Sequence, residues 1–255
     1  MQPLISIITV TYNAAAEVGA TMKSVSEQTF KDYEHLIVDG LSTDGTLDVV
    51  AGYQSDRLRV FSRKDSGIYH GMNRGLKYAE GKYVLFLNAG DRFADAGTLE
   101  RYAAEAKAGA DIIYGDTEIV DASGRVLRRR HLEAPGYLTY RSYLRGMLVC
   151  HQAFMVRKAI APAYSREFEL SADYDWCLNC IAASKITQRK NLKRVTIHYL
   201  DAGVSQKRKL VSLRERFEIM RRHFGLLNTV KAHLTFIPRA LRRRIDKIGR
   251  KKGAN

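Results

Sequence analysis

A buried strand that ends in polar residues is the part of this sequence best suited to do chemistry. The apolar run Tyr83–Leu87 predicts a strand buried on both faces, and it stops at Asn88, Gly90 and Asp91. A carboxylate at the C-terminal end of such a strand is a common way to hold a metal ion or a phosphate group. The alternative for Asp91 is a polar turn without a ligand.

Further carboxylates stand at places where they can act on a substrate. Asp39 follows the apolar run Tyr33–Val38, so it is expected at the same sheet edge as Asp91. Asp173 and Asp175 lie near the start of a predicted helix. A carboxylate within hydrogen-bond reach of a hydroxyl can take its proton as a general base. The alternative for Asp173 is an acid that simply stabilises the helix N-terminus.

Strands and helices alternate along the first 90 residues. Apolar runs predict strands at residues 4–10, 33–38, 58–61 and 83–87, and helical periodicity fills the segments between them. This order predicts parallel strands joined by right-handed crossovers, with ligands beyond the strand C-termini. The fold class is therefore α/β, a mostly parallel Rossmann-like sheet with helices on both faces.

The second half of the chain is less regular. The pattern predicts a helix at 98–108, a strand at 111–114 and a hairpin formed by 117–120 and 125–129. A strand at 147–156 is expected to carry His151 and Gln152. A last strand at 195–199 carries His198, and a loop containing Ser205 follows it.

Composition indicates an ordinary globular protein. The 255 residues are 45% hydrophobic and 27% charged, without an apolar run long enough to span a bilayer or a signal-peptide pattern, so a cytoplasmic protein is expected. The three cysteines, Cys150, Cys177 and Cys180, are an odd number, which argues against a disulfide framework. Although the last two form a CxxC pair, buried thiols are the preferred interpretation over a zinc or redox site.

The positive charge is concentrated at the C-terminus. Residues 206–255 hold sixteen Lys/Arg and three Asp/Glu, a net +13 of the chain's +15. Apolar residues at helical spacing run through this tail and predict basic amphipathic helices. We interpret residues 207–252 as a surface that docks on anionic membrane. The alternatives are a solvated charged helix and, on charge alone, nucleic-acid binding, which the near-neutral body of the chain and the lack of a recognisable motif disfavour.

Four motifs occur in order, each at a predicted strand end. They are TVTYN at 9–13, VDGLSTDGT at 38–46, DSGIY at 65–69 followed by NRG at 73–75, and FLNAGD at 86–91. Together they resemble the family-2 glycosyltransferases, closely over residues 4–91 and more loosely as far as 205. The resemblance implies the GT-A fold and an inverting transfer of a sugar from a nucleotide-diphosphate donor, of the UDP or GDP type, with Mn²⁺ or Mg²⁺.

The resemblance also implies roles for single residues. Asp91 matches the acidic residue that holds the metal. Residues expected to contact the nucleotide sugar are Thr11, Tyr12, Asn13, Asp39, Ser42, Asp44, Asp65, Gly67, Asn73, Asn88, Ala89 and Gly90. The sequence departs from the family at 88–91, where Asn-Ala-Gly-Asp replaces the usual Asp-x-Asp-Asp. Because two acids are missing, we expect metal binding to be weak without the donor.

The acceptor side is implied more loosely. Asp173 matches the family's general base, with Asp175 as a reserve. Contacts to the acceptor or the diphosphate are expected from His151, Gln152, Asp175, Trp176, His198 and Ser205. The chain lacks Gln-x-x-Arg-Trp, the mark of processive synthases, so one sugar per binding event is expected.

These observations give one hypothesis for the whole chain. Residues 1–205 are expected to form the glycosyltransferase domain, with a nucleotide-sugar-binding half at 1–91 and an acceptor-binding half at 92–205, and 206–255 a basic helical tail. The enzyme would add one sugar to a lipid-linked acceptor in surface-polysaccharide synthesis, on the inner face of the cytoplasmic membrane. The alternatives are a nucleic-acid-binding protein and a glycosyltransferase-like scaffold that has lost activity. A sugar-nucleotide pyrophosphorylase is disfavoured because no Gly-rich basic loop follows the first strand.

Overall fold

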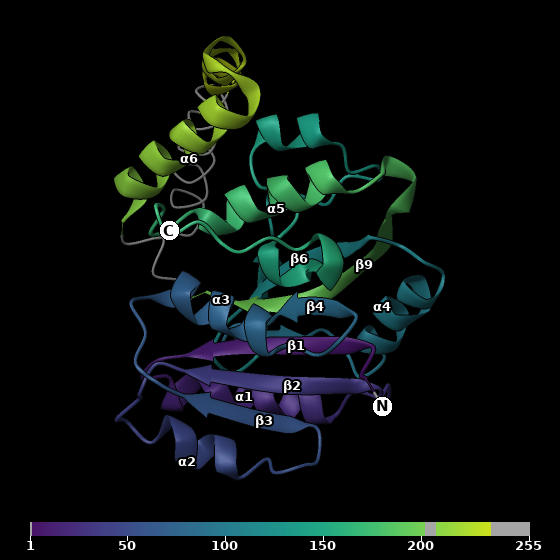
Figure 1. Ribbon diagram of the computed structural model, residues 1–255, viewed down its shortest axis with the longest axis vertical. Helices are drawn as coiled ribbons and strands as arrows, with labels where there is room; N and C mark the ends of the chain where they lie inside the picture. Colours follow the sequence, from purple (N-terminus) through teal and green to yellow (C-terminus); the bar gives the residue numbers. More distant parts are fainter. Residues whose placement is uncertain (1, 202–207, 236–255) are drawn as a thin grey trace, which may run out of the picture.

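One mixed sheet forms the centre of the molecule (Figure 1). The computed structural model describes residues 2–201 and 208–235. Within them the strand order is β3-β2-β1-β4-β8-β6-β9-β5, and β7 pairs with β6. The strands are β1 (Ile5–Thr11), β2 (Tyr33–Asp39), β3 (Leu58–Ser62), β4 (Tyr83–Phe86), β5 (Arg92–Phe93), β6 (Ile112–Val120), β7 (Val126–Arg129), β8 (Phe154–Arg157) and β9 (Arg189–Leu200).

The first four strands are parallel, as the sequence predicts. β1 pairs with β2 and β4, and β2 with β3, so that Thr11 lies beside Asp39 at the C-terminal edge. β6 and β9 are also parallel, whereas β8, β5 and β7 run antiparallel to their neighbours. The continuous apolar sequences of β1 and β2 fit strands that are covered on both faces.

Helices cover both faces of the sheet. The helices are α1 (Ala15–Ser26), α2 (Thr46–Ala51), α3 (Ile68–Tyr78), α4 (Thr98–Lys107), α5 (Ala172–Ala183) and α6 (Lys209–Phe224). Buried side chains of α3, α5 and α6 share one core with β1, β4 and β6. Those of α1, α2 and α4 form clusters on the opposite face. Short 3₁₀ turns lie at Tyr140–Arg145, His151–Ala153, Lys158–Ile160 and Ile186–Gln188.

Glycines allow α3 to lie close to β1. A Cβ atom on Gly71 would come within 2.6 Å of Val10 Cγ1, and one on Gly75 would meet Ile8. These two residues stand four apart, on the same face of the helix. Their small size therefore sets how near the start of α3 comes to the end of β1, where the sequence places its nucleotide-binding motifs.

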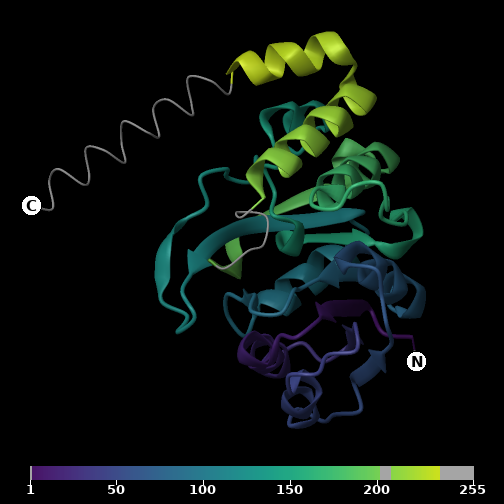
Figure 2. The ribbon, with the colours of Figure 1, turned by 90° about the vertical axis from the view of Figure 1, so that its left-hand side faces the viewer.

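The C-terminal segment continues the fold as helices. α6 ends at Gly225, where the chain turns, and residues 226–235 form a further helix that projects from the body (Figure 2). Ile219 and Met220 are buried in the same core as α5. The division of the chain at residue 205 stays a prediction, and its loop residue Ser205 lies outside the described residues, as do 236–255 of the predicted tail.

One predicted strand is wrong. Residues 147–156 do not form a single strand, because His151–Ala153 is a 3₁₀ turn and β8 begins only at Phe154. The apolar residues before it are buried as loop, so burial rather than strand pairing explains the hydrophobic run. The predicted strands at 111–114 and 117–120 are one continuous strand, β6.

Candidate active site

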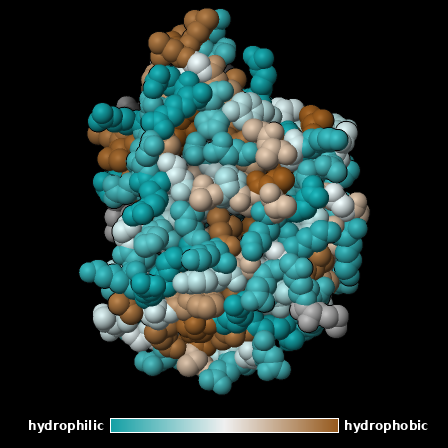
Figure 3. Space-filling view, viewed as in Figure 1, coloured by the Kyte–Doolittle hydropathy of each residue, from teal (hydrophilic) through white to brown (hydrophobic). Residues whose placement is uncertain are grey.

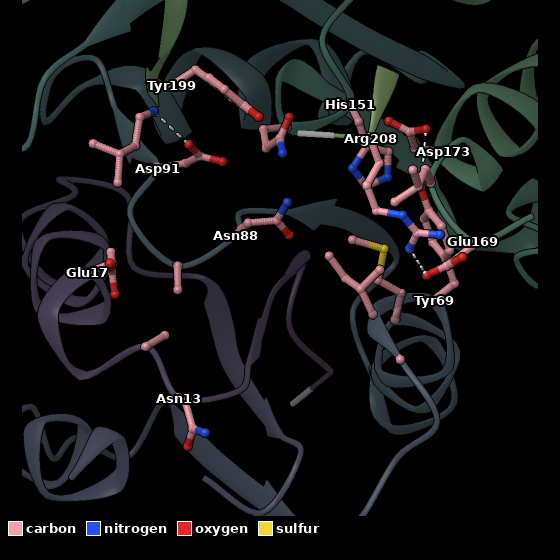
Figure 4. Close-up of a pocket in the computed structure, with 18 of the residues that line it drawn as sticks. Asn13, Glu17, Tyr69, Asn88, Asp91, His151, Glu169, Asp173, Tyr199 and Arg208 are labelled. Carbon is pink, nitrogen blue, oxygen red and sulfur yellow. Dashed lines mark hydrogen bonds and ion pairs between the residues drawn. The ribbon is translucent and has the colours of Figure 1, made fainter. Parts of the chain in front are cut away.

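A cleft of about 600 Å³ opens beyond the C-terminal ends of β1 and β4. Figure 4 shows Asn88 between Asp91 on one side and His151 and Asp173 on the other. The cleft's polar lining residues include Asn13, Glu17, Ser66, Asn88, Asp91, His151, Gln152, Glu169, Asp173 and Arg208. A second hollow of about 690 Å³ adjoins it and shares Gly67, Asn88 and Ala89 with it. The second hollow is also lined by Thr11, Tyr12, Gly40, Leu41, Lys64 and Asp65.

Asp39 is the centre of a satisfied hydrogen-bond network beneath the second hollow. Its carboxylate accepts bonds from the hydroxyls of Thr11 (3.0 Å), Ser42 (2.5 Å) and Ser62 (2.7 Å), and from Ser42 N (3.0 Å). Burial alone would raise the pKa of Asp39, but these donors outweigh it and hold the pKa below its usual range. Asp39 therefore remains a carboxylate that ties the ends of β1, β2 and β3 together.

The loops after β1 and β2 are also joined directly. Ser42 Oγ accepts from Asn13 N (2.9 Å), and Asn13 Oδ1 accepts from Thr43 N (2.9 Å). Asp44 accepts from Ala15 N (3.0 Å) at the start of α1. Asn13 has a φ of +48°, in a region that asparagine tolerates better than most residues. The first two motifs thus form one preorganised surface around Asp39, which we call the wall. The Tyr12 side chain beside it is mostly exposed.

The residues of the third motif lie in two places, beside the second hollow and against the loop at Tyr164. Asp65 accepts from Gly67 N (3.1 Å) and lines the second hollow, and Gly67 begins α3 with a φ of +125°. Asn73 instead faces Tyr164, donating to its carbonyl (3.0 Å) and accepting from its N–H (2.7 Å). The structure therefore places Asn73 as a support for the loop at 164 and not among the residues that line either cleft.

The turn after β4 holds Asn88 and Asp91 at the cleft. Asp91 N donates to the Asn88 carbonyl (3.0 Å), and the Thr21 hydroxyl donates to the Asp91 carbonyl (2.7 Å). Gly90 has a φ of +94°, and a Cβ there would come within 2.6 Å of Leu200 Cδ2. Glycine is therefore required both by the turn and by the nearby end of β9.

Asp91 and Asn88 carry unmet polar capacity. The Asp91 side chain accepts one bond, from Leu200 N (2.9 Å), and burial raises its pKa to about 8. Asn88 Oδ1 is buried without a hydrogen-bond partner. A buried acceptor without a donor is costly unless a ligand satisfies it. Both groups therefore suit a cation or a ligand that donates hydrogen bonds.

These groups fit a divalent metal only in part. Within residues 2–201 and 208–235, no three His, Cys, Asp or Glu side chains gather as a metal site. One carboxylate and one amide oxygen are what the turn supplies, and both are ligand types that Mg²⁺ and Mn²⁺ accept. The remaining ligands would have to come from water and substrate phosphates, and weak metal binding without the donor stays a prediction.

Asp173 borders the cleft from the start of α5. Its Oδ1 accepts from Tyr174 N (2.8 Å) and lies 3.4 Å from the Tyr69 hydroxyl of α3. The side chain is half-buried and remains in contact with the cleft. A carboxylate with this placement can accept a proton from a hydroxyl that enters the cleft.

His151 and Gln152 lie at the base of the cleft. The His151 Nε2 atom is 2.5 Å from the Tyr164 hydroxyl, and burial lowers the pKa of the imidazole to about 4. His151 is therefore neutral at pH 7 and positions Tyr164. Gln152 Oε1 accepts a bond from Cys150 Sγ (2.9 Å). His151 and Gln152 line the cleft from a 3₁₀ turn rather than the predicted strand.

Three predicted acceptor contacts lie elsewhere. Asp175 bonds to His223 Nε2 (2.7 Å) of α6, and Trp176 is fully buried and donates to the Pro162 carbonyl (2.8 Å). His198 Nε2 lies 3.6 Å from Glu118 Oε2 on β6. Helical periodicity explains the position of Asp175, because the residue two after Asp173 does not share its face of the helix.

Sequence reasoning missed several lining residues. Tyr69, Tyr199, Glu169 and Arg208 all border the cleft, and Figure 4 shows Arg208 reaching across to Glu169. Tyr69 lies within the DSGIY motif at the start of α3, so the sequence does carry a signal for its place near the cleft. Glu169 and Arg208 come from irregular chain, where no periodic pattern places a side chain.

Comparison with known proteins agrees with this geometry. The model of the family described as Glycosyl transferase family 2 matches residues 6–163, more than half of the chain. The chain belongs to this family of glycosyltransferases. A PGL/p-HBAD biosynthesis glycosyltransferase of Mycobacterium bovis is 34% identical over 196 residues, 73% of each chain. The family member TuaG of Bacillus subtilis, a putative teichuronic acid biosynthesis glycosyltransferase, is 38% identical over 95 residues, 36% of this chain and 38% of TuaG.

Solved structures show the same fold. TarS 1–349 of S. aureus, solved in complex with UDP-GlcNAc, has a TM-score of 0.72 and 22% identity, with 86% of this chain and 65% of TarS covered. The mannosyltransferase PcManGT of Pyrobaculum calidifontis, in complex with GDP-Man and Mn²⁺, has a TM-score of 0.60 and 14% identity, covering 91% of this chain and 74% of PcManGT. This family-2 glycosyltransferase therefore has the predicted GT-A fold.

Proposed function

We propose that this glycosyltransferase moves one sugar, with inversion, from a nucleotide-diphosphate sugar to a lipid-linked acceptor in surface-glycan synthesis. The observation that carries the proposal is the meeting of Asn88, Asp91 and Asp173 around one cleft, beyond the ends of parallel strands. The names of its relatives in glycolipid and teichuronic acid synthesis, and the sugar nucleotides bound in TarS and PcManGT, support this choice.

The residues divide into a donor side and an acceptor side. The wall built on Asp39, with Tyr12 exposed above it, would receive the base and ribose, of a UDP or GDP donor. Asn88 and Asp91 would hold Mn²⁺ or Mg²⁺ beside the diphosphate, and the ion would offset the charge that develops on the leaving group. The unpaired Asn88 amide oxygen and the Asp91 carboxylate suit an ion that takes its other ligands from the diphosphate and from water.

Asp173 would act as the general base. The acceptor hydroxyl loses its proton to Asp173 as its oxygen bonds to the anomeric carbon, and the bond from that carbon to the diphosphate oxygen breaks. The electron pair leaves with the nucleoside diphosphate. Because attack comes from the face opposite the leaving group, one displacement inverts the configuration. Tyr69, 3.4 Å from Asp173 Oδ1, would orient the carboxylate.

A thermal-shift panel of UDP, GDP, CDP and dTDP, each with and without Mn²⁺, tests the donor side. A ligand that binds only the native state raises the unfolding midpoint, by about 2.7 kcal/mol of stability at one hundred times its Kd. We expect UDP or GDP to raise the midpoint, and more strongly with Mn²⁺. If none of the four shifts the midpoint with metal present, the inactive-scaffold alternative gains support.

We also propose that the C-terminal helices rest on anionic membrane at the inner face of the cytoplasmic membrane. Leu226, Leu227 and Leu234 are 59%, 68% and 61% exposed, beside the basic residue Lys231. Brown apolar atoms gather over these helices at the top of Figure 3. No helix in the described ranges is both long and apolar enough to cross a bilayer. Exposed leucines with basic neighbours are typical of an interfacial helix.

Pelleting with vesicles that contain anionic lipid tests this docking. The variant Leu226→Ser/Leu227→Ser is expected to lose pelleting, because two apolar side chains no longer enter the interface. Val126→Ser/Leu127→Ser is the matched control, since these residues are also exposed but lie on β7. Wild-type protein that binds duplex DNA but ignores the vesicles would favour the nucleic-acid alternative.

A further inference from the structure

A third cleft, of about 590 Å³, is also lined by Asp173. It shares His151, Gln152, Asp173 and Tyr199 with the cleft described above, so Asp173 borders both spaces. Its other walls include β6, β7 with the segment after it, and the first turns of α6. Because Asn88 and Asp91 do not line this cleft, a molecule in it would reach Asp173 without occupying the proposed donor site.

The lining of this third cleft is strongly basic. Four arginines, Arg128, Arg129, Arg130 and Arg216, face two aspartates, Asp173 and Asp201. Arg128 is neutralised by Asp201, to which it donates two bonds (2.9 and 3.2 Å). A cleft that keeps excess positive charge near a desolvated wall attracts anions.

The other arginines are not neutralised in the same way. Arg130 donates to the carbonyls of Leu132, Met147 and Leu148, and among residues 2–201 and 208–235 no carboxylate forms an ion pair with it. Arg129 is mostly exposed, and its Nε atom is 3.9 Å from Glu118.

Arg216 stands out among them. It is half-buried on α6, its Nε atom is buried without a hydrogen-bond partner, and within the described residues no carboxylate pairs with it. A buried guanidinium donor normally has an acceptor, because leaving it unpaired costs free energy. An anionic group in the cleft would supply that acceptor and, with a planar oxyanion, two parallel hydrogen bonds.

We propose that the third cleft binds an anionic group of the acceptor, a phosphate or a carboxylate, through Arg216 assisted by Arg129. This rests on the proposed function, because it places the acceptor's hydroxyl at Asp173 and its charged group in the third cleft. The donor's diphosphate belongs to the Asn88 and Asp91 side, so the arginines of this cleft do not serve it. The acceptor class is therefore an acidic saccharide or a saccharide carried on a phosphate.

Binding of small anions to the full-length protein, kept saturated with UDP and Mg²⁺, tests the proposal. Glucose 1-phosphate, glucuronate and neutral methyl glucoside would be compared by saturation-transfer NMR. We expect the two anions to bind and the neutral sugar to bind at least tenfold more weakly, the effect of losing a charge-assisted hydrogen bond. Tighter binding of the phosphate than of the carboxylate would assign the group to a phosphate carrier, and the reverse to an acidic sugar.

Variants on α6 test whether anion binding depends on Arg216 itself or on the positive charge of the helix in general. Arg216→Gln is expected to weaken anion binding about tenfold, Arg216→Lys less, and Arg214→Gln not at all, since Arg214 is exposed on the same helix outside the cleft. UDP affinity should be the same in all three. The proposal is overturned if wild-type protein binds the neutral sugar as well as the anions, or if Arg216→Gln leaves anion binding intact or weakens UDP binding equally. If UDP does not bind, GDP takes its place in the assay, and failure of both to bind wild-type protein would instead overturn the proposed function.

Discussion

The wall around Asp39 and the turn at Asn88–Asp91 lie at the same sheet edge but differ in how their polar atoms are satisfied. Asp39 accepts four bonds from the protein's own hydroxyls and backbone, which keep its pKa low. Asp91 accepts one, and its pKa rises to about 8, while Asn88 Oδ1 has no partner. The first region is complete as it stands, whereas the second is completed by a ligand. Substitutions around Asp39 should therefore act mainly on stability, whereas substitutions in the Asn88–Asp91 turn should act on ligand binding.

Replacing Asp173 should give the largest effect. Asp173→Asn keeps the shape of the side chain but removes the base, so transfer to acceptor should fall about 10²- to 10⁴-fold while UDP affinity stays unchanged. Single-turnover transfer and UDP binding would be measured together. Asp175→Asn is the control, because Asp175 bonds to His223 and not to the cleft. Equal losses in the two variants would contradict the assignment of the base.

Asp39→Ala should act mainly on stability. It leaves the hydroxyls of Thr11, Ser42 and Ser62 without their acceptor, at a cost of about 1–3 kcal/mol. For a chain of this size each 1 kcal/mol lowers the thermal midpoint by about 2–4 °C. Asp65→Ala is the comparison, since the Asp65 carboxylate accepts a bond from Gly67 N and should cost less. An Asp39 variant that melts like wild type would show that the wall is not held by this carboxylate.

Asp91 should make the ligand-free protein less stable as pH rises. Its carboxyl holds a proton up to about pH 8 in the folded state but releases it near 3.8 when unfolded, so stability falls as pH increases between these values. Asp91→Asn removes this dependence, so its midpoint should exceed the wild-type midpoint more at pH 8.5 than at pH 5. Adding UDP with Mn²⁺ at pH 8.5 should stabilise wild type and not the variant. Melting curves with a constant difference across pH would refute the raised pKa.

The cysteines should have the smallest effect, because their thiols are free and buried. Cys150, Cys177 and Cys180 are free and buried, and burial raises the pKa of each thiol. A thiol reagent should therefore label the native protein slowly and the urea-unfolded protein at once. Rapid labelling of the native CxxC pair would revive the redox or metal interpretation.

The sequence predicts the first half of the fold well because each local signal there agrees with the next. Four apolar runs, each followed by a polar strand end, leave one arrangement for a parallel sheet, and Thr11, Asp39 and Asn88 meet as expected. The second half depends on long-range packing. His151 lies in a buried turn that resembles a strand in sequence, because hydrophobicity records burial and not hydrogen-bond pairing.

The sequence predicts several of the residues that gather at the cleft, but not the directions in which their side chains point. Motif position correctly brought Asp91, Asp173, His151 and Gln152 to one cleft. It could not tell that Asn73 turns toward Tyr164 or that Trp176 enters the core, because a motif gives residue types and not side-chain direction. Nor could the sequence show that Arg216 and Asp173 line the same cleft, since these residues are far apart in the chain.

The bond from Leu200 N to Asp91 has a consequence for how variants of this enzyme can be interpreted. Because a backbone N–H makes the contact, every amino acid except proline at position 200 can preserve it. Substitutions at position 200 would therefore leave the Asp91 carboxyl in place. A sequence alignment would show a variable position, although the backbone bond to Asp91 is required there. Only Leu200→Pro would remove this bond, because proline has no N–H to donate. For this bond the protein requires a backbone N–H at position 200, and not a leucine side chain.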